Sequence, residues 1–277
     1  MTRAAVRDAD GSRYRHHSLG FLAGAVIGTL AGLVGLGGAE FRLPVLVGAF
    51  RVPTLEAVIL NKAISLVVVA AALFARSGTI PFDQVSQHGD VVLNLLAGSL
   101  AGAWWAAGHA MTMPRRWLNR IILVLLAGLA VLMLAEAGLG LHDTAAPLFE
   151  ATAWQIVAGL LAGFGIGAVA ALLGVAGGEL LIPTIVLLYA LDIKLVGSLS
   201  LAISLPTMLV GFARYSSAQA FSVLREERRL LLWMAAGSVV GVGLGGLLLG
   251  TVPAKSLTAL LGLILLISAV KTFQHAD

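Results

Sequence analysis

Long apolar segments alternate with short polar stretches along almost the whole chain. Stretches with almost no charged residue cover residues 19–36, 55–75, 91–108, 117–135, 155–174, 230–250 and 256–270, with a further span at 196–214. Most are close to the roughly 20 residues that cross a hydrocarbon core as a helix. The strands of a membrane β-barrel would instead alternate apolar and polar residues over about ten positions. The pattern therefore predicts an all-α polytopic membrane protein with about eight hydrophobic segments.

The two halves of the chain repeat each other at a constant spacing of 139 residues. Matched pairs include Gly20 and Gly159, Glu40 and Glu179, Pro44 and Pro183, Ser65 and Ser204, and Gly98 and Gly237. Duplicated halves occur in many secondary-transporter folds. The basic N-terminus followed by an apolar stretch resembles a signal peptide, but the recurrence of that stretch in mid-chain indicates a structural segment. We predict a cytoplasmic tail (1–18), a first repeat (19–137), a linker (138–155) and a second repeat (156–277).

Each repeat begins with an unusually long apolar segment, at 19–50 and 156–190, that contains a cluster of glycines. The clusters are Gly35-Leu36-Gly37-Gly38-Ala39-Glu40 and Gly174-Val175-Ala176-Gly177-Gly178-Glu179. Glycine disfavours a helix by about 1 kcal/mol relative to alanine, and the proline four residues after each cluster lacks a backbone donor. We therefore predict two helices broken at the glycines, with first legs of about 17 residues and second legs of about 11.

The positive-inside rule tests whether each broken segment crosses the membrane or turns back. With a single crossing and a cytoplasmic N-terminus, four arginines fall outside: Arg51, Arg115, Arg116 and Arg120. With a hairpin these four become cytoplasmic, and the basic residues outside are then Arg76, Lys194 and Lys255. The hairpin segregates the charges better, so we predict hairpins, halves of inverted topology and a cytoplasmic N-terminus. The run from Arg225 to Arg229 is interpreted as a solvated cytoplasmic loop.

Composition narrows the classes of function. The chain is 59% hydrophobic and 12% charged, against about 45–50% and about 25% in a soluble domain. Its basic residues stand in short clusters between apolar spans, which is typical of membrane topology rather than of nucleic-acid binding. No cysteine is present, which excludes disulfides and thiolate metal sites. Phosphate-loop, zinc-hydrolase and serine-nucleophile motifs are absent, so we predict no enzyme, no cofactor and no metal site, and no ATP-driven transport by this chain alone.

Glycines at intervals of four residues predict closely packed helices. They form the series Gly20, Gly24, Gly28 and Gly32, the series Gly159, Gly163 and Gly167, and the shorter series Gly98 and Gly102, and Gly237, Gly241 and Gly245. Small residues on one helical face allow another backbone to approach closely. We interpret these glycines as scaffold.

The broken tips are the candidate binding site. Unwound backbone within a membrane must be buried in protein or line a polar cavity, because lipid offers it no hydrogen bonds. The legs that follow Gly37-Gly38 and Gly177-Gly178 begin with helix N-termini, whose partial positive charge favours anions. Many transporters bind substrate at paired sites of this kind. The alternative is a packing kink with no ligand.

Four ionisable residues lie at or near the tips: Glu40, Arg42, Lys62 and Glu179. A charged side chain at the membrane centre costs about 2.5–3.5 kcal/mol on insertion scales, so it usually faces a partner or a polar pathway. In one interpretation Arg42 and Lys62 bind an anion, while Glu40 and Glu179 couple transport to protons or anchor a cation. In the other, the four charges only neutralise one another and hold the two halves together.

Polar side chains recur at matching heights on the next span of each half. They are Asn61 and Ser65 in the first half, and Ser200 and Ser204 in the second. These groups would donate hydrogen bonds either to an oxyanion or to neighbouring helices.

The two glycine-rich elements resemble a motif of the TauE/SafE family of sulfite exporters, also called the 4-toluene sulfonate uptake permease family. Residues 35–44 and 174–183 are similar to that family's G-x-G-G-G-x-x-x-x-P element, which also occurs once per half. The chain departs from the motif at Ala39 and Ala176, where glycine is usual, and in the charges Arg42 and Lys62, whose second-half counterparts are leucines. The resemblance implies an inner-membrane transporter for sulfite, sulfonates or other organosulfur anions.

We therefore expect a secondary transporter in the bacterial inner membrane that exports a small anion through a site between the two glycine breaks. Its expected partners are the anionic solute, the lipid bilayer and a coupling proton or ion. A passive channel and a non-transporting membrane subunit of a larger complex are the alternatives, since a channel would show flux without saturation and a subunit would show no flux alone.

Overall fold

The computed structural model describes residues 18–30, 38–76, 82–139, 147–149, 151–191, 193–215, 218–247, 259, 262–267 and 269–270. These residues form helices joined by short turns, and none of them is in a strand, which confirms the all-α prediction for this part of the chain. The helices are Ser18–Leu30, α2 (Ala39–Gly48), α3 (Thr54–Arg76), α4 (Phe82–Gln87), α5 (Gly89–Thr112), α6 (Arg115–Leu139), α7 (Thr152–Leu173), α8 (Gly178–Tyr189), α9 (Ile193–Tyr215), α10 (Ala218–Glu226) and α11 (Arg228–Leu247).

Five of these helices are long and apolar enough to cross a membrane. Their candidate spans are Thr54–Ala71, Gly89–Thr112, Arg115–Ala135, Thr152–Leu173 and Leu195–Tyr215. Large apolar side chains on their outer faces are exposed, as in Leu93 at 68% and Leu161 at 69%. A surface of this kind suits lipid, where burying apolar area needs no protein partner. The Ser18–Leu30 and α8 helices are apolar but shorter, so the predicted number of about eight spans is matched only in part.

Helices α10 and α11 correct the interpretation of one polar stretch as a loop. Residues 225–229, expected to form a solvated loop, instead complete α10 and begin α11 with only Glu227 between them. The arginines of this stretch are exposed, so its solvated character is as expected while its conformation differs.

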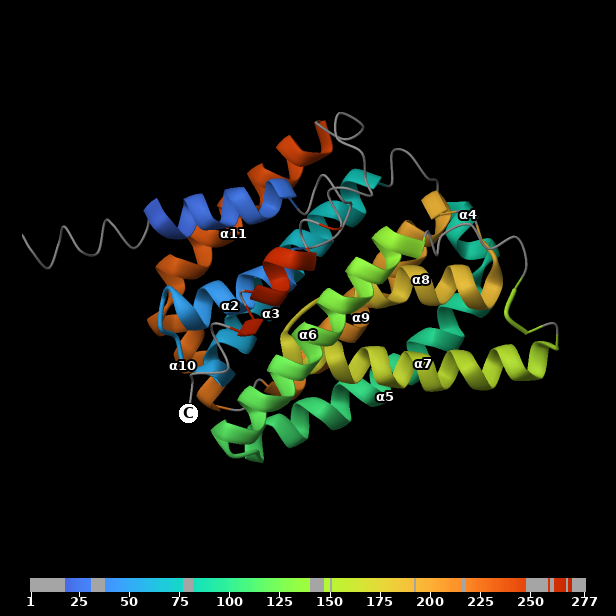
Figure 1. Ribbon diagram of the computed structural model, residues 1–277, viewed down its shortest axis with the longest axis horizontal. Helices are drawn as coiled ribbons and strands as arrows, with labels where there is room; N and C mark the ends of the chain where they lie inside the picture. The colour runs from blue at the N-terminus through green and yellow to red at the C-terminus, as the bar shows by residue number, and fades with distance from the viewer. Residues whose placement is uncertain are drawn as a thin grey trace, which may run out of the picture.

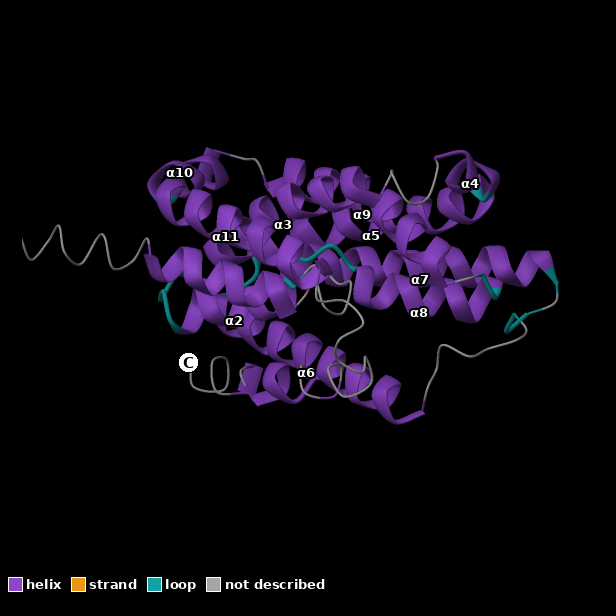
Figure 2. Cartoon of the chain, turned by 90° about the horizontal axis from the view of Figure 1, so that it is seen from above, coloured by secondary structure: helices purple, strands orange, loops and turns teal. Residues whose placement is uncertain are grey.

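The broken segment of the second half turns back on itself. The backbone N–H of Leu148, just before α7, donates to the carbonyl of Leu187 near the end of α8 at 2.8 Å. Gly159, early in α7, likewise lies against the hydroxyl of Tyr189, the last residue of α8. Figures 1 and 2 both show α8 running back beside α7 toward its start. The predicted hairpin is therefore present in this half of the chain.

The first half follows the same course over its described residues. In both views α2 lies on the same side of the molecule as the Ser18–Leu30 helix, at the end where α10 also lies (Figures 1 and 2). The residues that join these two helices, including Gly32 and Gly35 to Gly37 of the predicted break, lie outside the described residues.

The glycine series pack helices of one half against helices of the other. Gly163 and Gly167 of α7 lie against the backbone of Leu95 and Ser99 in α5, where a Cβ atom would overlap it. The equivalent contacts in the other half join Gly24 and Gly28 of the first helix to Met234 and Ser238 of α11. The predicted close packing is therefore confirmed for these glycines.

These contacts repeat at the spacing of the sequence repeat. Leu95 and Met234 are 139 residues apart, as are Ser99 and Ser238. The reverse contacts obey the same rule: Gly98 and Gly102 lie on Leu160 and Phe164, and Gly237 and Gly241 lie on Phe21 and Ala25. The first leg of each half thus packs on the third element of the other.

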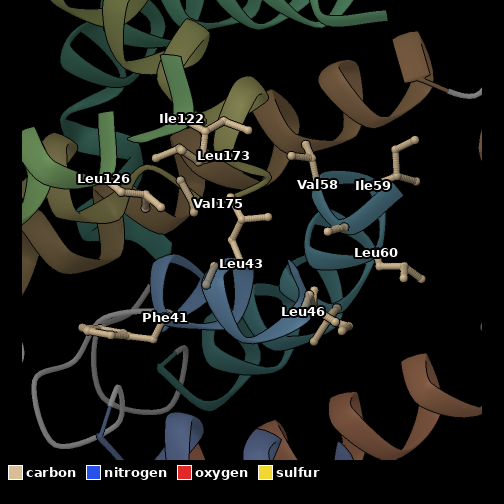
Figure 3. Close-up of a cluster of buried hydrophobic side chains, with 14 of the residues drawn as sticks. Phe41, Leu43, Leu46, Val58, Ile59, Leu60, Ile122, Leu126, Leu173 and Val175 are labelled. Carbon is tan, nitrogen blue, oxygen red and sulfur yellow. The ribbon is translucent and has the colours of Figure 1, made fainter. Parts of the chain in front are cut away.

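The main apolar core lies where α2 meets α3, α6 and the second glycine break. Figure 3 shows Leu43 of α2 beside Val175, with Leu173, Ile122 and Leu126 grouped nearby. Leu43, Leu173, Ile122 and Leu126 have no exposed surface. Because α2 is only 10 residues long, this burial on several sides fixes its position better than its own hydrogen bonds can.

Candidate functional site

The second break has the backbone conformation that only glycine adopts without strain. Helix α7 ends at Leu173, and α8 begins at Gly178. Between them, Gly174 and Gly177 have φ values of 68° and 80°. In this left-handed region a Cβ atom would be strained, and at Gly174 it would also overlap the carbonyl of Val58. The break predicted from the glycine cluster is confirmed here.

The first break has an equivalent N-terminus. Gly38 precedes α2 with φ 64°, just as Gly177 precedes α8. Gly37, a predicted site residue, lies outside the described residues. Neither helix receives a side-chain cap at its first residues, so their leading N–H groups are available to a ligand or to nearby acidic groups.

The prolines lie inside the second legs rather than at the breaks. Pro44 and Pro183 are each the sixth residue of their helix, α2 and α8. Proline has no N–H, so the carbonyl four residues earlier, that of Glu40 or Glu179, lacks its usual helical donor. Each tip therefore offers its leading N–H groups as donors and the carbonyl of Glu40 or Glu179 as an acceptor.

Asn61 of α3 joins the two breaks. Its Nδ2 atom donates to the carbonyl of Ala39 at 2.8 Å and to the carbonyl of Leu173 at 3.0 Å. These are the first residue of α2 and the last residue of α7. Asn61 is fully buried, and its Oδ1 atom accepts no hydrogen bond within the described residues. A single amide thus holds the tips of both halves at one point on α3.

Three of the four predicted charged residues meet at this point. The carboxyl group of Glu40 lies close to that of Glu179, and the guanidinium of Arg42 is within electrostatic range of both. Glu40 and Arg42 are at most 1% exposed, and Glu179 is 6% exposed. The two carboxylates stand in the first turns of α2 and α8, where the helix dipole stabilises negative charge.

Lys62, the fourth charged residue, points elsewhere. Its Nζ atom is 3.4 Å from the carbonyl of Ala170 in α7 and 5.8 Å from the ring centre of Tyr215 in α9. No acidic side chain among the described residues lies within electrostatic range of it. Glu40, Glu179 and Arg42 therefore lie together, and the Lys62 ammonium does not join them.

The predicted hydroxyl groups are buried, with different surroundings. Ser65 and Ser204 are 1% exposed, and their Oγ atoms have no hydrogen-bond partner among the described residues. Ser200 donates to the carbonyl of Gly197 in its own helix at 3.1 Å and lies beside Gly178 at the start of α8. Buried hydroxyls without partners are rare in proteins, so Ser65 and Ser204 are well suited to receive a polar ligand.

Sequence reasoning missed the neighbours of Lys62. Gly211 and Tyr215 are one helical turn apart on α9 and both face the ammonium group. Ser198, also buried without a partner among the described residues, escaped notice because its first-half counterpart is Ile59. Spacing of four residues between Gly211 and Tyr215 marks a shared helical face, but nothing in the sequence says which helix that face meets.

The charged residues around the two breaks do not form a typical metal site among the described residues. No group of three or more histidine, cysteine, aspartate or glutamate side chains occurs within the part of the chain that the structure describes. What the site offers instead is two helix N-termini, a buried guanidinium and two carboxyl groups, with the buried ammonium of Lys62 turned away toward α7 and α9. Groups of this kind suit the binding of small ions.

Comparison with known families agrees with this geometry. The sequence model described as sulfite exporter TauE/SafE matches residues 19–272, which is nearly the whole chain. No curated protein and no solved structure matches the chain. Since the match includes both glycine breaks and every described membrane span, it applies to the transporter architecture as a whole. The chain is a multi-pass membrane transport protein that belongs to the TauE/SafE sulfite exporter family.

Proposed function

We propose that this protein exports a small sulfur oxyanion, sulfite or an organic sulfonate, across the bacterial inner membrane, driven by a coupling proton or cation. The observation that carries the proposal is the meeting of the two broken helices around Glu40, Glu179 and Arg42. Family membership supports a sulfite-exporter type of transporter.

The tips supply what an oxyanion needs. Leading N–H groups of α2 and α8 carry the positive end of the helix dipole and donate hydrogen bonds to anions. The buried hydroxyls of Ser65 and Ser204 add donors that no described residue uses. An oxyanion bound there would satisfy donors that would otherwise be buried without partners, a cost of about 1–3 kcal/mol each.

The cluster of Glu40, Glu179 and Arg42 would also couple anion transport to a proton or cation. Arg42 carries one positive charge, whereas Glu40 and Glu179 together carry two negative charges when both are ionised. An excess negative charge buried in a low-dielectric site is costly, so a proton or a cation would accompany it. An entering anion repels the ionised pair, and the two occupancies are therefore linked in free energy.

The repeated contacts support alternating access about this site. The helix pairs related by the spacing of 139 residues have matching glycine contacts in the two halves. Together with hairpins that give each half an odd number of crossings, this supports inverted repeats, whose relative rocking exposes a central site to each side in turn. A cytoplasmic N-terminus agrees with the arginines Arg51, Arg115, Arg116 and Arg120 on one side.

The test is flux through the purified full-length chain in proteoliposomes. Sulfite and sulfoacetate are loaded inside and their efflux is measured with and without an imposed proton or sodium gradient. Saturable flux that follows one gradient is the expected result. Flux that never saturates would establish a channel instead, and no flux of either anion would remove the sulfur-anion proposal.

A further inference from the structure

Lys62 is buried away from the carboxylate pair that neutralises Arg42. It projects from α3 toward α7 and α9, with 0% of its surface exposed. Its one described hydrogen bond, to the carbonyl of Ala170, is long at 3.4 Å. That carbonyl already accepts the backbone N–H groups of Gly174 and Val175. The ammonium, with three donors, therefore has little compensation from these contacts for its loss of water.

The space around the ammonium is shaped by α9. A Cβ atom on Gly211 would stand 2.6 Å from Lys62 Nζ, so the glycine makes room for the charged group. One turn further on, the face of the Tyr215 ring lies 5.8 Å from the same atom. The Tyr215 hydroxyl donates to the carbonyl of Ala171 at 3.2 Å, which fixes the ring in this position.

These contacts stabilise a cation only in part. The aromatic ring attracts a cation through its face, and the C-terminal end of α7 attracts it through the helix dipole. Neither replaces an anionic partner, without which a buried ammonium is strongly disfavoured. No acidic side chain among the described residues offers that partner, and an anion that entered this space would supply it.

We propose that Lys62 binds the transported oxyanion directly, as a point charge in a subsite formed by α3, α7 and α9. Arg42 serves the carboxylate pair and does not contact the substrate in this arrangement. The proposal rests on the anion-export function proposed above and divides the two cations of the first half between two tasks. The subsite belongs to the first half alone, because Leu201 stands at the equivalent position of the second half.

The experiment uses the full-length chain with two substitutions that act differently on the subsite. Lys62→Met removes the charge and keeps the length of the side chain. Gly211→Ala keeps the charge and displaces it. Leu201→Met is the matched control at the equivalent position of the other half. Each variant is assayed for sulfite flux in proteoliposomes and for the shift of its melting temperature by sulfite in detergent.

The expected result is a KM for sulfite raised about tenfold or more in Lys62→Met, and loss of the sulfite-induced melting shift, because a charged hydrogen bond is removed. Gly211→Ala should raise KM several-fold, while Leu201→Met should behave as wild type. Without sulfite, Lys62→Met should melt no lower than wild type, since an unpaired buried charge has gone.

Three outcomes overturn the proposal. If wild type transports sulfite and both variants keep its KM, Lys62 does not bind the anion and the export function still stands. If Lys62→Met melts lower with an unchanged KM, the lysine only caps the end of α7. If wild type shows neither flux nor a melting shift, the export function and the Lys62 subsite fall together.

Discussion

At the scale of single residues, the site is defined by an unequal set of charges. Glu40 and Glu179 occupy equivalent positions in the two halves, but Arg42 has Leu181 as its counterpart. The repeat therefore supplies two acids and the first half alone supplies their cation. One glutamate suffices to balance Arg42, and in the proposed function the second is the group that exchanges its charge with a proton or cation during transport.

Neutralising one glutamate should uncouple transport and spare the fold. In Glu40→Gln, Glu179 still balances Arg42, so we expect efflux of sulfite to persist down its own gradient and no longer to follow an imposed proton or sodium gradient. In the double variant with Glu179→Gln, Arg42 would be buried with neither carboxylate, and a loss of about 3–5 kcal/mol of stability follows. Flux assays and thermal melting in detergent measure the two effects.

Glu56→Gln is the control for these variants, since Glu56 lies in the first turn of α3 and is only partly buried. It should leave coupling and melting unchanged. Full gradient dependence in Glu40→Gln and in Glu179→Gln would show that the carboxylate pair is a structural charge network.

At the scale of helices, glycine position decides how closely the two halves approach. On α7, Gly167 faces the backbone of Ser99 on α5, whereas Gly165, two residues earlier, has nothing within 4 Å of a Cβ atom. Residues two apart on a helix point to nearly opposite sides. The two glycines therefore differ only in the face they occupy, and so offer a matched pair for testing the packing.

Substituting the two glycines by alanine should have opposite effects. Gly165→Ala should stabilise the protein by up to about 1 kcal/mol, because alanine is the better helix former. Gly167→Ala should destabilise it by about 1–3 kcal/mol, the typical cost of overpacking a tight contact. Melting temperatures in detergent compare them directly. If both variants melt alike, the close contact between α5 and α7 is wrong.

The helix breaks could be predicted from the sequence because they depend on the backbone conformation of single residues. Gly174 and Gly177 adopt positive φ values that other residues avoid, so glycine there is visible without knowledge of the fold. Which residues share the site was harder to predict. Asn61 and Lys62 are neighbours in the chain, yet about 100° of helical rotation separates them. One reaches the glycine breaks and the other the face of α9.

At the scale of the whole molecule, the hairpins place the helix ends on two opposite sides. Figures 1 and 2 show α10 and the start of the Ser18–Leu30 helix at one end, with α4 and the start of α7 at the other. With the proposed cytoplasmic N-terminus, a hairpin in each half would put α4 outside the cell and the turn before α6 inside. A single crossing with the same cytoplasmic N-terminus reverses both assignments and leaves α10 in the cytoplasm in either case.

Cysteine labelling distinguishes these topologies, because the natural chain has no cysteine. Gln87 in α4, Arg116 at the start of α6 and Arg225 in α10 are all exposed, so cysteine at each should react freely. With an impermeant thiol reagent on intact spheroplasts, we expect Gln87→Cys to be labelled and Arg116→Cys to be labelled only after permeabilisation. Arg225→Cys is the control, protected until permeabilisation in both topologies. Labelling of Arg116→Cys with protection of Gln87→Cys would refute the inverted halves, and with them a site that the two halves expose in turn.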